Sequence, residues 1–277
     1  MLTPLLVSPS NRAAIGVFDS GVGGLTVFKA LSERLPHERM VYLGDTARVP
    51  YGTKSPEVVT RYSLGCAREL LQHELKALVV ACNTASALAL GALEAQLPVP
   101  VVGVITPGAT AAAAATKSKR VAVIATPATI ASGAYQRALH EARADLEVRA
   151  KACPLFVPLA EEGWTQGDVP RLVAREYLGQ GFVDGADTLV LGCTHYPLLR
   201  DVIAEAVGPA VTLVDSAHAT AEHVAGLLKA RGLLAPAGNA PERHFLVTDT
   251  PARFVEIAGR FLGQPIAGAQ QVDLKLA

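Results

Sequence analysis

The stretch TLVLGCTHYPLL, residues 188–199, is a run of apolar residues that stops at a cysteine, Cys193. A short apolar run of this kind is typical of a parallel strand that is buried on both faces. The stretch ALVVACNTASAL, residues 77–88, repeats the pattern around Cys82. The sequence therefore predicts two buried strands, each of which places a thiol at the start of a helix.

Apolar runs alternate with longer helical patterns along the rest of the chain. The predicted strands are 15–18, 40–44, 77–81, 100–105, 120–125, 146–150, 188–192, 211–215 and 244–248. The predicted helices are 24–34, 56–75, 85–95, 129–144, 169–179, 217–231 and 251–262. This alternation predicts an α/β fold in which mostly parallel sheets carry helices on both faces.

The order of the polar strand-end loops repeats between the two halves of the chain. Asp19 precedes Cys82 by 63 positions, and Thr126 precedes Cys193 by 67 positions. We therefore expect two pseudo-symmetric α/β domains. Because ligands of open α/β sheets bind beyond the carboxyl ends of the strands, facing domains would place both cysteines across one cleft.

Two thiols on opposite walls of a cleft suit one kind of chemistry. The thiolate is the effective base, and the start of a helix favours an anion at that position. A thiolate can remove a proton from one face of a carbon centre while a thiol returns a proton to the other face. The pair therefore fits inversion of a carbon centre. Cys66 and Cys153 are expected in the core, as small apolar residues.

Composition narrows the class of protein. The 277 residues carry 25 Lys+Arg and 25 Asp+Glu, and this zero net charge favours neither a nucleic-acid surface nor an acidic tail. No uninterrupted apolar run reaches the length of a membrane span. The N-terminal MLTPLLVSPSN has no basic flank and is expected to be a loose tail, not a signal peptide. Four cysteines without a C-x-x-C pair indicate free thiols in the cytoplasm.

The residues alone leave other thiol sites open. Cys82, Cys193 and His195 could bind zinc, although the paired ligand spacing usual for zinc does not occur. A cysteine and a histidine could also form a hydrolase, which would leave the second thiol loop unexplained.

A dinucleotide site is a further alternative. In FDSGVGGLTV, residues 18–27, Gly21 and Gly23 fit a dinucleotide-binding fingerprint, but the third glycine position is Thr26. Asp45 lies where a ribose-binding acid would be expected. Against this site, the carboxylate of Asp19 would repel a pyrophosphate.

Five segments together resemble the bacterial glutamate racemases, members of the cofactor-independent aspartate/glutamate racemase superfamily. They are GVFDSGVGGLTV, YLGDTARVPYG, ACNTAS, GVITPG and LGCTHYPLL, and the likeness extends from about Ile15 to about Leu262. The resemblance implies interconversion of L- and D-glutamate, with D-glutamate supplied to peptidoglycan synthesis. It also implies a homodimer and no metal, pyridoxal phosphate or nucleotide cofactor.

The same resemblance assigns roles to particular residues. The catalytic residues it implies are Cys82, Cys193, Asp19, His195 and Glu161. Asp19 would assist Cys82, and His195 would assist Cys193. Glu162 adjoins Glu161 and is the alternative carboxylate. The substrate-binding residues it implies are Asp19, Ser20, Tyr51, Gly52, Asn83, Thr84, Thr194 and His195, with Thr126 as a weaker candidate.

The architecture of these racemases also implies domain boundaries. One domain would comprise 1–105 plus 216–277, and the other 106–215, with the active site between them. An aspartate or hydantoin racemase, or a binding protein without activity, remains an alternative at this stage.

Overall fold

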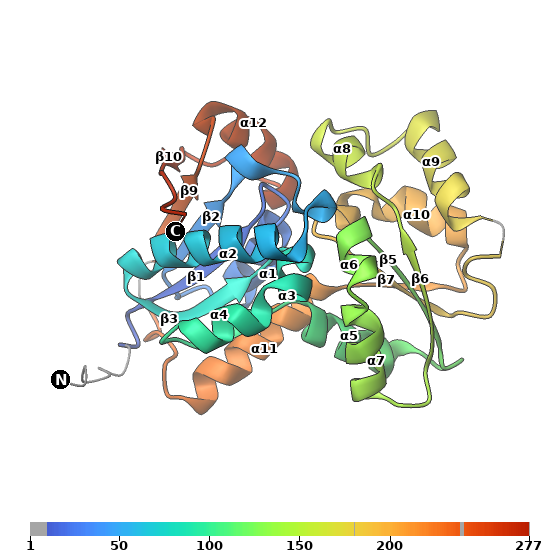
Figure 1. Ribbon diagram of the computed structural model, residues 1–277, viewed down its shortest axis with the longest axis horizontal. Coiled ribbons are helices and arrows are strands. Elements are labelled where there is room, and N and C mark those ends of the chain that lie inside the picture. The colour runs from blue at the N-terminus through green and yellow to red at the C-terminus, as the bar shows by residue number, and fades with distance from the viewer. Residues whose placement is uncertain (1–9, 180, 239–240, 277) are drawn as a thin grey trace.

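The computed structural model of the protein describes residues 10–179, 181–238 and 241–276. Residues 1–9 of the expected tail lie outside this range. The described strands form two sheets, one of six strands and one of four, and the neighbouring strands within each sheet pair in parallel (Figure 1). The predicted class, two α/β units with parallel sheets, is confirmed.

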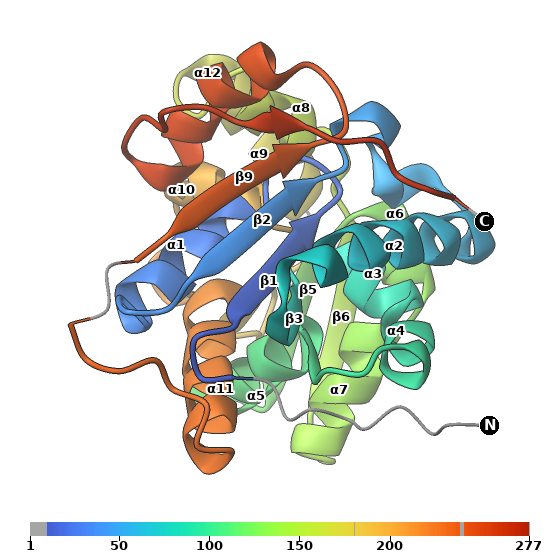
Figure 2. The same cartoon turned by 90° about the vertical axis from the view of Figure 1, so that its left-hand side faces the viewer.

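The first sheet has the strand order β10-β9-β2-β1-β3-β4, and Figure 2 shows its central strands side by side. Its strands are β1 (Ala14–Asp19), β2 (Met40–Gly44), β3 (Leu75–Val80), β4 (Val101–Gly103), β9 (Arg243–Val247) and β10 (Gln270–Gln271). The second sheet has the order β6-β5-β7-β8. Its strands are β5 (Arg120–Ala125), β6 (Glu147–Ala152), β7 (Thr188–Gly192) and β8 (Thr212–Asp215).

Helices connect the strands and cover the sheets. The α-helices are α1 (Leu25–Arg34), α2 (Pro56–Leu70), α3 (Asn83–Leu88), α4 (Leu90–Gln96), α5 (Ile105–Ala115), α6 (Pro127–Ala131), α7 (Ala134–Ala142), α8 (Phe156–Glu161), α9 (Asp168–Leu178), α10 (Arg200–Val207), α11 (Ser216–Ala230) and α12 (Pro251–Leu262). Four short 3₁₀ helices among the described residues are η1 (Thr46–Arg48), η2 (Tyr51–Thr53), η3 (Leu71–His73) and η4 (Tyr196–Leu199).

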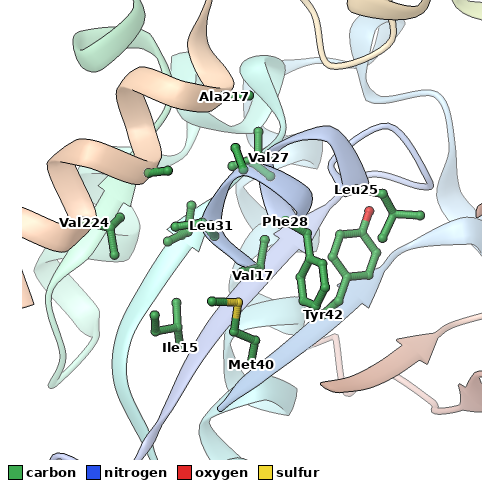
Figure 3. Packing of buried hydrophobic residues seen from close by; sticks show 14 of the residues in the cluster. Ile15, Val17, Leu25, Val27, Phe28, Leu31, Met40, Tyr42, Ala217 and Val224 are labelled. Carbon is green, nitrogen blue, oxygen red and sulfur yellow. The ribbon is translucent and has the colours of Figure 1, made fainter. Parts of the chain in front are cut away.

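The central strands β1, β2 and β3 of the first sheet are buried on both faces, which explains why they are largely apolar. Every residue of β1 and β3 is buried. One face packs under α1, α11 and α12, and the other under α2, α3 and α4. Figure 3 shows the first of these interfaces, where Phe28 and Leu31 of α1 lie over Val17 and Tyr42 of the sheet. Burial of such side chains contributes about 1.5–3 kcal/mol each.

Helix α11 ties the two units together. It follows β8 of the second sheet in the chain, yet Ala217 and Val224 on this helix pack into the core of the first sheet beside α1 (Figure 3). The chain crosses between sheets twice, through α5 and through α11. The domain boundaries that we predict, 105/106 and 215/216, fall at these crossings and stay a prediction.

Several predicted elements differ in the structure. The predicted helix 129–144 is two helices, α6 and α7, because Gly133 has a left-handed backbone with φ of 66°. The predicted helix 56–75 ends at Leu70, and Glu74, with φ of 51°, turns the chain into β3 two residues earlier than expected. Helix α9 begins at Asp168, one residue before the predicted start at 169.

The predicted elements do not include helix α8 or strand β10. Helix α8 begins in an apolar run that contains two prolines, and strand β10 is only two residues long. Neither segment has enough length or periodicity to stand out from loop sequence.

Candidate active site

Both thiol loops lie at the carboxyl ends of their sheets, and one cavity joins them. Cys82 follows β3 and precedes α3, and Cys193 follows β7 and precedes η4. Both cysteines line a cavity of about 130 Å³. The other lining residues are Ser20, Val49, Pro50, Tyr51, Gly52, Thr53, Asn83, Thr84, Thr126, Pro127, Pro154, Val157, Pro158, Glu161, Thr194 and His195. The wall therefore takes residues from both halves of the chain.

Cys82 is held as a protonated thiol. Its sulfur accepts a hydrogen bond from the Ala85 N–H at 3.5 Å and donates to the Ser20 hydroxyl at 3.6 Å. Burial, reinforced by the nearby charge of Asp19, raises the pKa of Cys82 to about 12, and the two hydrogen bonds offset this only in part. The expectation that the helix start favours a thiolate is wrong for Cys82, because desolvation and a like charge outweigh the helix.

Asp19 lies behind Cys82 and not in the cavity wall. Its carboxylate is fully buried; Oδ2 accepts from the Gly21 N–H at 2.9 Å, and Oδ1 has no hydrogen-bond partner among the described residues. Burial raises the pKa of Asp19 above its usual value, against the charge of His195 and two backbone N–H groups. The raised pKa brings this carboxyl group closer to proton exchange with Cys82, and its predicted contact with substrate stays a prediction.

The second thiol belongs to a chain of three side chains. His195 Nδ1 lies 3.8 Å from Cys193 Sγ, and His195 Nε2 lies 2.8 Å from Glu161 Oε1. Burial lowers the pKa of His195, but its bonds to Cys193 and Glu161 outweigh burial and raise the pKa to about 10. At neutral pH the imidazole is therefore a cation, and it lies beside the sulfur of Cys193.

The structure distinguishes the two neighbouring glutamates. Glu161 contacts His195, whereas the exposed Glu162 pairs with Arg253 of α12 at 3.2 Å. Arg260 of α12 donates to the backbone carbonyl of Glu161, and the ring of Phe261 packs edge-on against His195 at 5.5 Å. Helix α12 of the first sheet thus supports the imidazole of the second thiol loop.

Glycines let the two strand-end loops approach each other. A Cβ at Gly23 would lie 2.3 Å from Thr194 Oγ1, and one at Gly24 would lie 2.5 Å from Asp19 Cβ. The Thr26 hydroxyl also lies 3.3 Å from the Thr194 carbonyl. The glycine loop of 18–27 therefore packs against the Cys193 loop, a role that differs from the dinucleotide alternative.

Asp45 also has a role other than the ribose contact weighed above. It is fully buried; Oδ1 accepts from Arg48 at 2.6 Å and from Thr248 at 2.8 Å, and Oδ2 accepts from the Tyr51 hydroxyl at 2.6 Å. These bonds fix the loop that carries Tyr51 and Gly52 into the cavity wall.

The remaining predicted binding residues line the cavity together. They are Ser20, Tyr51, Gly52, Asn83, Thr84 and Thr194, and Thr126 joins them. Thr126 Oγ1 lies 2.9 Å from Thr84 Oγ1, across the two units. Sequence reasoning missed the apolar part of the wall, which includes Pro154 just before α8 and Pro158 in the first turn of this helix. For the segment between β6 and α8, the only sequence signal of a place in the cavity wall was the matching order of the strand-end loops in the two halves of the chain.

Further observations concern other kinds of site and segment. Over residues 10–179, 181–238 and 241–276, no three or more His, Cys, Asp or Glu side chains are grouped so that they could hold a metal ion. Among the described helices, none combines the length and apolar character that crossing a membrane requires. A larger hollow of about 680 Å³, between α1 and residues 262–268, contains none of the predicted site residues.

Sequence comparison identifies the class of protein to which this fold and cavity belong. Residues 15–224 match the family described as Asp/Glu/Hydantoin racemase. The chain belongs to this family of racemases.

Individual relatives within the family are named for one substrate, glutamate. A glutamate racemase of Geobacter metallireducens is 56% identical over 262 residues, which are 95% of this chain and 97% of the relative. The crystal structure of glutamate racemase isoform RacE1 from Bacillus anthracis, 41% identical, has a TM-score of 0.92 and covers 96% of this chain and 100% of its own. The Francisella tularensis glutamate racemase in complex with D-glutamate, 40% identical, has a TM-score of 0.88 over 96% of this chain and 99% of its own.

Proposed function

We propose that this protein is a glutamate racemase that interconverts L- and D-glutamate without a cofactor and supplies D-glutamate for peptidoglycan synthesis. The observation that carries the proposal is that Cys82 and Cys193 line one cavity from the ends of two different sheets. The identity of the substrate is supported by relatives that are glutamate racemases and that match this chain over nearly their full length. We further propose that the active form is a homodimer, which the resemblance to glutamate racemases implies, and that it is cytoplasmic, as the free thiols indicate.

The proposed reaction transfers two protons. In the direction that begins at the second loop, the Cys193 thiolate takes the α-hydrogen as a proton and becomes a thiol. The C–H electron pair remains on the α-carbon, next to the substrate carboxylate. The Cys82 thiol then gives its proton to the opposite face of that carbon and becomes a thiolate. The reverse direction exchanges the two roles.

The neighbours of each thiol set its protonation state before the reaction begins. The imidazolium of His195 steadies the Cys193 thiolate, and the raised pKa of Cys82 keeps its proton in place for delivery. We infer that Asp19, whose pKa is also raised, returns a proton to Cys82 after turnover. The lining hydroxyls and the Asn83 amide would bind the substrate carboxylates, and the Tyr51–Gly52 loop would cover them.

A racemisation assay tests this function directly. Dialysed protein is incubated with L-glutamate, and the optical signal is followed by circular dichroism, with L-aspartate and a hydantoin in parallel. We expect the L-glutamate signal to decay to zero without added cofactor. Faster racemisation of aspartate or the hydantoin would assign the protein to another substrate of the family, and no racemisation of any of them would contradict the proposal.

Glu161→Gln should weaken catalysis and change its pH dependence. The charge of Glu161 helps raise the pKa of His195 to about 10, so its loss lowers that pKa. We expect kcat/KM to fall about 10- to 100-fold, and the alkaline limb of its pH profile to move to lower pH, since His195 then loses its proton earlier. Glu162→Gln is the matched control and should leave both rate and profile unchanged. An unmoved alkaline limb in Glu161→Gln would contradict the role given to the His195–Glu161 pair.

A further inference from the structure

One polar atom of the Asn83 side-chain amide, Oδ1, has a hydrogen-bond partner, and the other, Nδ2, has none among the described residues. Asn83 lines the cavity and is only 3% exposed. Its Oδ1 accepts a hydrogen bond from the Tyr135 hydroxyl at 2.7 Å, whereas its Nδ2 has no partner among the described residues. Because a buried N–H donor without an acceptor is costly, this group points to an acceptor supplied by a ligand.

Tyr135 reaches Asn83 from the other unit. It lies on α7, beside the second sheet, while Asn83 begins α3 at the end of β3. The ring is 1% exposed and packs directly on a strand end, since a Cβ at Gly192 would lie 2.8 Å from Tyr135 Cε2. The position of the hydroxyl is therefore fixed by packing and not only by its bond to Asn83.

Ser216 is the neighbour of the Tyr135 hydroxyl on the side of α11. It begins that helix and is 4% exposed, and its side chain interacts with the Tyr135 hydroxyl. The tyrosine O–H donates to Oδ1 of Asn83. A donor at this point selects the oxygen of the amide and turns its NH₂ group away from Tyr135.

We propose that Tyr135 is a positioning residue that fixes the Asn83 amide so that its NH₂ group donates to a carboxylate of the substrate. Tyr135 itself does not line the cavity and acts through Asn83. The inference rests on the proposed function for the identity of the substrate, glutamate. It adds that substrate binding depends on a hydrogen bond between the two units.

Tyr135→Phe tests the proposal in the full-length protein, with steady-state racemisation of both enantiomers. We expect KM to rise about tenfold and kcat to change by less than about threefold, because the lost interaction serves binding in ground and transition states alike. The factor in kcat/KM should be the same for both enantiomers, which have equal free energies in water. An unchanged KM would overturn the proposal, while the wild-type assay still reports on the proposed function.

A double-mutant comparison separates positioning from a general structural effect. If Tyr135 acts through Asn83, adding Tyr135→Phe to Asn83→Ala should change KM by less than about twofold. Independent, multiplying effects of the two substitutions would contradict the proposal. Tyr196→Phe is the matched control, since its buried hydroxyl donates to the carbonyl of Cys153 at 2.8 Å, and Cys153 does not line the cavity. It should leave KM within about twofold.

Ser216→Ala provides the same test with a smaller change, should Tyr135→Phe fail to fold. Because the serine side chain interacts with the Tyr135 hydroxyl, its removal loosens the hydroxyl that holds the Asn83 amide. We expect KM to rise about two- to threefold on the wild-type background and not at all on Asn83→Ala. If Ser216→Ala leaves KM unchanged on both the wild-type and the Asn83→Ala backgrounds, or raises it equally on both, the positioning role of Tyr135 would be refuted.

Discussion

Cys82→Ser and Cys193→Ser should each reduce racemisation of glutamate by at least about 10³-fold, because each removes the only acid/base on one face of the α-carbon. A serine hydroxyl fills nearly the same space as the thiol but is a far weaker acid. Its proton is therefore neither taken nor given at a useful rate. The measurement is the initial rate of loss of the circular dichroism of L-glutamate, and of D-glutamate, for each variant.

The two variants should also differ from each other. Cys82→Ser keeps the Cys193 thiolate and His195, so it should exchange the α-hydrogen of one enantiomer with solvent, and Cys193→Ser should favour the other enantiomer. Cys153→Ala is the control, because Cys153 is fully buried and does not line the cavity. It should racemise glutamate at close to the wild-type rate. A thiol variant in the cavity that keeps the wild-type rate would refute the two-base mechanism.

Lys76→Met should destabilise the fold by about 3–5 kcal/mol, because it leaves a buried carboxylate without its partner. Lys76 is fully buried and Glu38 is 2% exposed, and the two form an ion pair at the amino end of β3. The Lys76 ammonium also donates to the carbonyls of Asn11 at 2.7 Å and Leu233 at 2.8 Å. One cation therefore joins β3, the turn before β2 and the segment after α11.

Urea denaturation measures this loss as a change in the free energy of unfolding. Lys119→Met is the matched control, since it breaks an ion pair whose side chains are 58% and 50% exposed, and should cost less than about 1 kcal/mol. Adding Glu38→Gln to Lys76→Met should recover part of the loss, because the amide is neutral and still accepts from the Ala235 N–H. Equal losses for the two lysine variants would show that burial of the pair does not matter.

The sequence predicted the strands well because parallel strands buried on both faces are almost wholly apolar. The thiol loops at Cys82 and Cys193 followed from where those apolar runs stop, and both cysteines do line one cavity. Broken helices were less predictable, since the pattern through Gly133 keeps a helical period although the glycine backbone turns left-handed.

The electrostatics of the site could not be predicted from local sequence. The raised pKa of Cys82 depends on Asp19, 63 positions away, and on burial, which only the fold determines. The choice between Glu161 and Glu162 depends on where α8 ends relative to His195. Tyr135 was missed because its contact with Asn83 joins two units across 52 positions.

The origin of the hydrogen delivered to the α-carbon tests the central claim most directly. L-glutamate with ordinary hydrogen at that carbon is converted in deuterium oxide, stopped early, and the two enantiomers are separated and analysed by mass spectrometry. Two bases that each exchange with solvent predict that the first D-glutamate formed carries deuterium, while the remaining L-glutamate keeps its hydrogen. D-glutamate that retains the original hydrogen, or L-glutamate that gains deuterium as fast as product forms, would contradict the account.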